Sequence, residues 1–218
     1  MSANLKKRFI TSLFLFLLLT LMYYYSFIMI ISLIIISLIT WVEFYAIVSK
    51  IYSKDNLKEH VLRIIFKAIS LFYLSMIVSL IILNHNTETF ILIIYSMFVS
   101  IASDIGGIVI GKIFKGKKLT KISPNKTISG SIGSFIFSLL LIPFFINYLN
   151  IASLVQLSFI TIVISLASQL GDLFISSLKR KAKIKNTSDI LPGHGGFLDR
   201  IDGMIFAIPI GTVLFKFL

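Results

Sequence analysis

Long apolar runs follow one another from one end of this 218-residue chain to the other. A helix needs about 20 apolar residues to cross about 30 Å of hydrocarbon, so each run is long enough for one membrane span. With 57% hydrophobic residues and a mean hydropathy of +0.97, the chain has a composition unlike that of a soluble domain. We therefore expect an all-α polytopic membrane bundle that forms a single membrane-embedded domain over residues 1–218.

The charge pattern predicts how this bundle is oriented. We predict about seven transmembrane helices, at residues 9–25, 27–48, 64–84, 89–111, 131–149, 151–178 and 201–218. Of the 21 Lys and Arg, 20 lie in the N-terminus or in three connections: 49–67, 112–126 and 179–200. Because basic connections stay in the cytoplasm, these segments are expected inside and the C-terminus outside. This predicts a multi-pass protein of the cell inner (plasma) membrane.

Composition also excludes several classes of protein. The chain has no cysteine, which rules out disulfides, thiolate metal ligands and cysteine nucleophiles. Its net charge of +12 could indicate nucleic acid, but in a membrane protein such a charge more often records topology and contact with anionic headgroups. We therefore expect no nucleic-acid partner.

Asp172 is the strongest functional candidate within a span, where a charge costs about 2.5–3.5 kcal/mol on insertion scales. Polar residues at spacings of three and four place it on one helical face. This polar stripe consists of Ser165, Ser168, Gln169, Asp172, Ser176, Lys179 and Arg180. A packing seam of small residues with a basic end is the alternative. The serines fit that seam well, whereas the aspartate fits it poorly.

Two further acidic residues lie within or near predicted spans. Asp104 shares a helical face with Gly107 and Gly111, and close helix packing explains the glycines but not the aspartate. Glu43 lies beside aromatic residues near a predicted cytoplasmic end. Anchoring at the membrane interface explains it about as well as function does.

Two glycine-containing segments precede predicted spans. The segment KKLTKISPNKTISGSIGS, residues 117–134, offers Lys126, Thr127 and glycine amides to a phosphate, although an ordinary basic loop remains the alternative.

In GHGGFLDRIDG, residues 193–203, Asp199 and Asp202 stand three residues apart at the start of the last predicted helix. Carboxylates of this kind suit Mg²⁺, and Arg200 suits a phosphate. Helix capping by aspartate is the alternative. Acidic residues ringed by basic ones at the cytoplasmic ends of the C-terminal spans indicate phosphate chemistry on a lipid.

The run SSLKRKAKIKNTSDILPGHGGFLDRID, residues 176–202, resembles the signature of the phosphatidate cytidylyltransferases, or CDP-diacylglycerol synthases. The upstream segments QLGDLFISSLKR, SDIGGIVIGKIF and KISPNKTISG also resemble this family. The likeness covers about residues 100–203, so we expect a catalytic half at 89–218, whereas the spans within 1–88 match only in hydropathy. The sequence departs from the family pattern at Asn186 and Ser129, where the family carries acidic residues.

The resemblance implies that the chain transfers the cytidylyl group of CTP to phosphatidate, giving CDP-diacylglycerol and pyrophosphate. It implies Mg²⁺ bound by Asp172 and Asp199, with a monovalent cation left open, and catalytic roles for Lys126 and Arg200. The implied substrate-binding residues are Asp104, Thr127, Ser176, Lys179, Arg180, His194, Gly195, Gly196 and Asp202. CTP, phosphatidate and membrane lipid are the expected partners, and a homodimer stays open.

The rival classes are a CTP-dependent polyprenol or dolichol kinase and a transporter, although a transporter would often carry inverted repeats and broken midplane helices.

Overall fold

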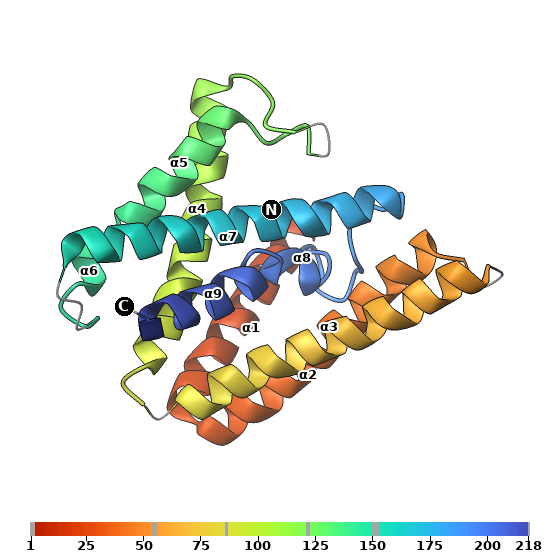
Figure 1. The fold of residues 1–218 in the computed structure, drawn as a ribbon, viewed down its shortest axis with the longest axis horizontal. Helices are drawn as coiled ribbons and strands as arrows, with labels where there is room; N and C mark the ends of the chain where they lie inside the picture. The colour runs from red at the N-terminus through yellow and green to blue at the C-terminus, as the bar shows by residue number, and fades with distance from the viewer. Residues whose placement is uncertain (1–2, 54–55, 86, 121–122, 150–152, 218) are drawn as a thin grey trace. The chain divides into compact units, whose positions relative to one another are not determined.

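The computed structural model describes residues 3–53, 56–85, 87–120, 123–149 and 153–217, and over these ranges its regular elements are helices. In chain order they are α1 (Ala3–Tyr24), α2 (Ser26–Ile51), α3 (Leu57–Asn84), α4 (Phe90–Phe114), α5 (Ile128–Leu139), α6 (Ile142–Phe145), α7 (Leu154–Lys181), α8 (Leu198–Ile201) and α9 (Met204–Phe217) (Figure 1). Five segments of the described chain are long and apolar enough to cross a membrane, with α5 and α6 together forming one of them. Shorter apolar helices at Arg8–Tyr24 and Met204–Lys216 match the first and last predicted spans. The predicted all-α polytopic bundle is confirmed.

Two predicted spans differ from the helices that form. The span expected at 131–149 is divided between α5 and α6, and Pro143 stands in the first turn of α6. Proline has no backbone N–H and is favoured in the first turn of a helix, so Pro143 favours a new start at α6 over continuation of α5. The span expected at 201–218 begins instead at Met204, because the chain turns at Asp202 and Gly203 before α9 starts.

The chain forms two compact units. The first contains Met1–Ile82 and Leu178–Ile201, which include α1, α2, α3, the end of α7, the following loop and α8. The second contains Leu83–Ser177 and Asp202–Leu218, which include α4, α5, α6, most of α7 and α9. The single membrane-embedded domain expected from the sequence stays a prediction.

In the first unit, aromatic and basic side chains join α2 to α3, which lie side by side in Figure 1. The Trp41 indole donates a hydrogen bond to the Lys67 carbonyl at 3.1 Å. The Lys67 ammonium lies 4.7 Å from the centre of the Tyr45 ring, and the Arg63 guanidinium lies 5.0 Å from it. Cation–π contacts of this kind hold long basic side chains against the helices and stabilise the pair.

In the second unit, glycines allow α4 and α5 to pack backbone against backbone. A Cβ atom added at Gly106 would lie 2.6 Å from Phe137 and even closer to the Gly133 carbonyl. One added at Gly130 would lie 2.7 Å from the Gly107 carbonyl oxygen. Gly130 and Gly133, considered above as part of a phosphate cradle, are therefore buried in a small-residue helix interface.

Hydroxyl groups connect α7 to α4 and α5. Ser168 is 2.7 Å from Ser100, the Ser165 hydroxyl donates to Ser103 at 3.0 Å, and all four of these serines are fully buried. Below them, an apolar core surrounds Tyr95 with Val99, Ile142, Leu149, Leu157, Ile160, Ile164 and Ala207. The first half of the predicted polar stripe is therefore a helix-packing seam.

Candidate active site

The second unit brings together Asp104, Lys126 and Asp172, three charged residues singled out from the sequence. The Lys126 ammonium forms an ion pair with Oδ2 of Asp172, and their side chains are 27% and 23% exposed. The Ser176 hydroxyl donates to Oδ1 of the same carboxylate at 3.1 Å. Asp104, on α4, is close enough to interact electrostatically with both Asp172 and Lys126. Beyond the serine seam, the polar stripe thus reaches a charge cluster at Asp172. Packing of serines between helices does not explain this cluster.

The backbone on either side of Lys126 fixes the position of this lysine. Its carbonyl accepts a hydrogen bond from the Leu119 N–H at 2.8 Å, so the connection from α4 folds back on itself. The next residue, Thr127, caps α5 by accepting from the Gly130 N–H at 3.0 Å. Such capping stabilises the helix start. As a result, the lysine is held at the beginning of α5 by regular local structure.

The first unit contains a second lysine–aspartate pair. The Lys179 ammonium lies 2.7 Å from Oδ1 of Asp199, and their side chains are only 13% and 9% exposed. The other oxygen, Oδ2, accepts backbone N–H bonds from Thr187 at 2.9 Å and Gly196 at 3.2 Å. Burial alone would raise the pKa of Asp199, but the hydrogen bonds and the Lys179 charge outweigh burial and hold this pKa below its ordinary value. The Asp199 carboxylate is therefore ionised at neutral pH.

A tight glycine turn precedes α8. The Leu191 N–H donates to the Gly195 carbonyl at 2.9 Å, and the His194 N–H donates to the Leu191 carbonyl at 2.8 Å. Gly195 has a φ of +85°, in the left-handed region that glycine adopts without strain. The Arg200 Nε donates to the His194 carbonyl at 2.9 Å. Arg200 thus braces the turn in addition to the phosphate-binding role that the resemblance implies.

The expectation that Asp199 and Asp202 stand together at the start of the last helix is wrong for Asp199. Asp199 belongs to the four-residue helix α8, whereas Asp202 lies in the turn before α9. The buried Asp202 carboxylate accepts a hydrogen bond from the Gly203 N–H at 2.9 Å. This is a local bond between a side chain and the backbone of the next residue, and the substrate-binding role expected for Asp202 stays a prediction.

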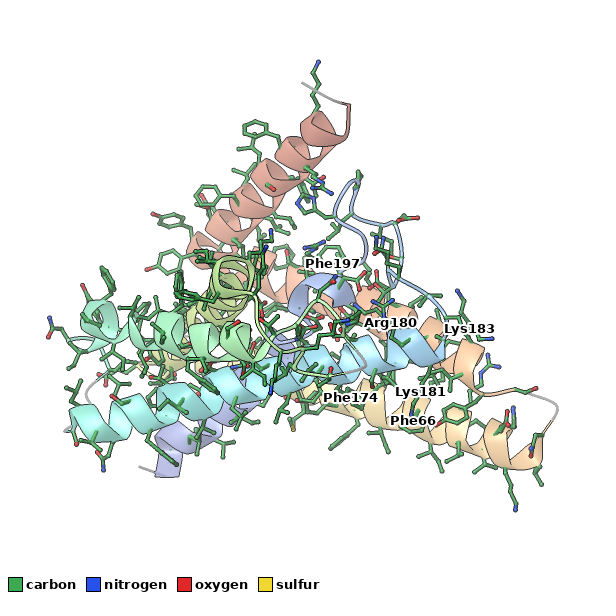
Figure 2. All side chains as sticks on the ribbon, turned by 90° about the horizontal axis from the view of Figure 1, so that it is seen from above. Phe66, Phe174, Arg180, Lys181, Lys183 and Phe197 are labelled. Atoms are coloured by element: carbon green, nitrogen blue, oxygen red, sulfur yellow. The ribbon has the colours of Figure 1, made fainter. Side chains whose placement is uncertain are left out.

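The basic end of α7 lies on the surface. Arg180, Lys181 and Lys183 are exposed and gather where α7 ends (Figure 2). Positive charge at the C-terminus of a helix is favourable because it opposes the partial negative charge of the unpaired carbonyls. The predicted role of Arg180 in substrate binding stays a prediction.

The sequence left Glu43 open between membrane anchoring and function, and the structure places this carboxylate near Asp199. Glu43, on α2, is 2% exposed and accepts hydrogen bonds from the Thr187 hydroxyl, between α7 and α8, and from the Leu198 N–H at the start of α8. Anchoring at the membrane interface, which explained Glu43 equally well from the sequence, does not account for a buried carboxylate bonded to this loop. In the sequence, the signal that favoured a specific role for Glu43 was the cost of placing a charge within a membrane span.

The first helix also contacts the glycine turn. The Arg8 Nε donates to the Gly193 carbonyl at 3.1 Å, and the Thr11 hydroxyl donates to the Pro192 carbonyl at 3.0 Å. From the sequence, the first spans match the family only in hydropathy. The structure shows that α1 and α2 both hold the turn.

Carboxylates and hydroxyls of this kind suit a hard cation such as Mg²⁺. Asp172 and Asp199, the expected ligands, belong to different units. Within the described ranges, no three Asp, Glu, His or Cys side chains form a group that could hold a metal. The oxygens present fit Mg²⁺ in their chemistry, although each carboxylate is now paired with a lysine. Magnesium binding therefore stays a prediction.

The fold and these charge clusters define a helical membrane protein with paired acidic and basic groups on its helices and their connections. The chain belongs to the cytidylyltransferase family, whose sequence profile matches residues 1–218. This finding confirms the resemblance noted from the sequence.

Individual relatives carry a more specific name. The chain is 42% identical over 127 residues to a phosphatidate cytidylyltransferase of Staphylococcus haemolyticus (strain JCSC1435), a match that covers 56% of this chain and 48% of the relative. It is 41% identical over 120 residues to a phosphatidate cytidylyltransferase of Bacillus subtilis (strain 168), covering 54% of this chain and 44% of the relative. The chain thus matches about half the length of these curated relatives.

Proposed function

We propose that this chain transfers the cytidylyl group of CTP to phosphatidate and releases pyrophosphate. A phosphate oxygen of phosphatidate attacks the α-phosphorus of CTP, the bond from that phosphorus to the bridging oxygen of the β-phosphate breaks, and CDP-diacylglycerol forms. The observation that carries the proposal is the lysine–aspartate pair found in each unit, Lys126 with Asp172 and Lys179 with Asp199. Lys179 and Asp199 lie in the run that resembles the family signature, and Lys126 and Asp172 lie in the upstream segments that also resemble the family. The names of the relatives support the same reaction.

The residues of this chain would act by positioning and by charge neutralisation, because the reacting phosphate is already ionised and needs no general base. Lys126 and Lys179 supply positive charge to CTP and the lipid phosphate. The turn around Gly195 lets the backbone approach the triphosphate closely. Arg200 keeps that turn in place through the His194 carbonyl.

Asp172 and Asp199 would hold Mg²⁺, since their carboxylates are ligands of the kind this ion prefers. When bound, Mg²⁺ supplies charge neutralisation of the triphosphate. Lys126 and Lys179, which are paired with these carboxylates without substrate, would bind phosphate oxygens of CTP or the lipid instead. Each lysine would therefore face a negative charge in both states: a carboxylate without substrate and a phosphate with substrate.

The proposed active site faces the cytoplasm from the cell inner (plasma) membrane, on the side where CTP is available. The support is the segregation of 20 of the 21 Lys and Arg into the segments expected inside. The basic groups near the site would also attract the anionic phosphatidate headgroup.

The test is turnover by purified protein in detergent with radiolabelled CTP, Mg²⁺ and defined lipids. We expect pyrophosphate release only when phosphatidate is present. Asp172→Asn and Asp199→Asn should each abolish turnover, whereas Asp189→Asn, at an exposed loop position, is the matched control and should keep most of it. Near-normal rates in both Asp172→Asn and Asp199→Asn would refute the roles given to these carboxylates. Turnover with a polyprenol in place of phosphatidate would assign the chain to the kinases, and CTP-independent solute movement across vesicles would make it a transporter.

A further inference from the structure

The Glu43 carboxylate on α2 is bonded to a loop far along the chain. It accepts hydrogen bonds from the Thr187 hydroxyl at 2.9 Å, the Ser188 hydroxyl at 2.5 Å, the Phe197 N–H at 3.1 Å and the Leu198 N–H at 2.8 Å. A carboxylate has about four lone-pair sites, so these donors use its full capacity. All four donors are neutral, and the carboxylate is 2% exposed.

These donors come from both ends of one segment, which we name the clasped loop, Thr187–Leu198. Thr187 and Ser188 begin it, and Phe197 lies in the turn that leads into α8 (Figure 2). Between them lies the glycine turn described above. Glu43 therefore ties together the two ends of the loop and fixes both ends to α2.

Glu43 and Asp199 share two neighbours. The Thr187 hydroxyl lies 2.9 Å from Glu43 and 3.1 Å from Asp199, and the Thr187 N–H donates to Asp199. The Gly196 N–H also donates to Asp199, at 3.2 Å. A Cβ atom added at Gly196 would lie 2.6 and 2.7 Å from the two Glu43 oxygens. Displacing Glu43 would thus disturb two of the groups that orient Asp199.

We infer that Glu43 is a positioning residue that holds the clasped loop so that Asp199 and the glycine turn keep their geometry for substrate. The inference rests on the proposed function, because it assigns Asp199 to that reaction. Glu43 acts through Thr187, Gly196 and the loop backbone and does not itself touch the reacting groups. Replacing it with glutamine would direct an amide N–H₂ at donors that now bond to carboxylate oxygen, which leaves buried donors unpaired.

The first experiment measures how firmly the loop is held. This chain lacks cysteine, and Leu191 in the clasped loop is buried, so Leu191→Cys provides a single reporter thiol. Its labelling rate with a maleimide should rise about 10-fold or more when Glu43→Gln is added. Glu43→Asp, which keeps a carboxylate, should restore part of the protection. Glu88→Gln, at an exposed position between α3 and α4, is the matched control and should leave the rate unchanged.

The second experiment measures turnover of CTP and phosphatidate by the same position-43 and position-88 variants on the cysteine-free background. Glu43→Gln should lower kcat about 10-fold or more and raise the Mg²⁺ concentration needed for half-maximal rate. Glu43→Asp should recover part of kcat. A purely structural role would reduce the yield of folded protein and leave kcat per folded molecule unchanged.

The outcomes separate this inference from the proposed function. Unchanged labelling together with unchanged kcat in Glu43→Gln would overturn the inference. Faster labelling in a protein whose parent shows no phosphatidate-dependent turnover would support the clasp and refute the proposed function. If Glu43→Gln does not purify as folded protein, Ser188→Ala removes a single donor and should still raise labelling about threefold or more. Unchanged labelling in Ser188→Ala would then overturn the inference.

Discussion

Replacing Lys179 with methionine should destabilise the protein measurably, because Asp199 would lose the cation that balances its charge. Removing one partner of a buried ion pair costs about 3–5 kcal/mol. The two side chains are 13% and 9% exposed, and Asp199 would keep its backbone donors from Thr187 and Gly196. We therefore expect a loss near the lower end, about 3 kcal/mol. For a chain of this size each kcal/mol lowers Tm by roughly 2–4 °C, so the expected fall in Tm is about 6–12 °C.

The assay is thermal unfolding in detergent of Lys179→Met, Asp199→Asn and the double variant. If the pair forms in solution, the double variant should be more stable than the two single losses predict, with a coupling energy of about 1–3 kcal/mol. A Tm for Lys179→Met within about 2 °C of the parent, or strictly additive losses, would refute this reasoning. Such a result would mean that the Lys179–Asp199 ion pair does not form stably in solution. Lys179 could then bind a phosphate without first breaking this pair.

Three further predictions follow from the same structure. Because the pKa of Asp199 is lowered in the folded protein, its stabilisation is complete above the unfolded value of about 3.9 and is lost as pH falls below it. Asp199→Asn should therefore flatten the acid-induced fall in Tm, and an unchanged fall would contradict this. Gly106→Leu should lower Tm more than Gly106→Ala, because both add atoms where α5 already lies, and equal values would contradict the close packing. Single cysteines at Lys118 and Lys183 should label only from the cytoplasmic side, and external labelling of either would overturn the predicted topology.

The long helices and their polar faces could be predicted from the sequence because hydropathy and helical periodicity are local properties. The polar stripe on α7 was correctly placed on one face, yet it serves two purposes. Ser165 and Ser168 pack against serines of α4, whereas Asp172 meets Lys126. In a sequence, a serine that packs between helices cannot be distinguished from one that lines a site. The difference depends on which residues of the neighbouring helix it contacts.

The details that the sequence missed depend on contacts between distant residues or on very short elements. Glu43 bonds to Thr187, 144 residues further along the chain, so no local pattern could connect them. Helix α8 has four residues, too few for periodicity to separate it from α9, and Asp199 was therefore assigned to the wrong helix. The metal and substrate roles of the site residues stay predictions, because they depend on ligands as well as on the fold.

The close approach of Glu43 to Gly196 has a consequence for how this sequence can drift during evolution. A side chain at position 196 would collide with the Glu43 carboxylate and the Thr187 hydroxyl, so the glycine is required by the protein itself, whatever the substrate. Loss of Glu43 by mutation would relax only part of that requirement, because the Thr187 hydroxyl would still occupy the space that a side chain at position 196 needs. Substitutions at positions 43, 187 and 196 should therefore covary among descendants of this chain, since each position limits what the others accept.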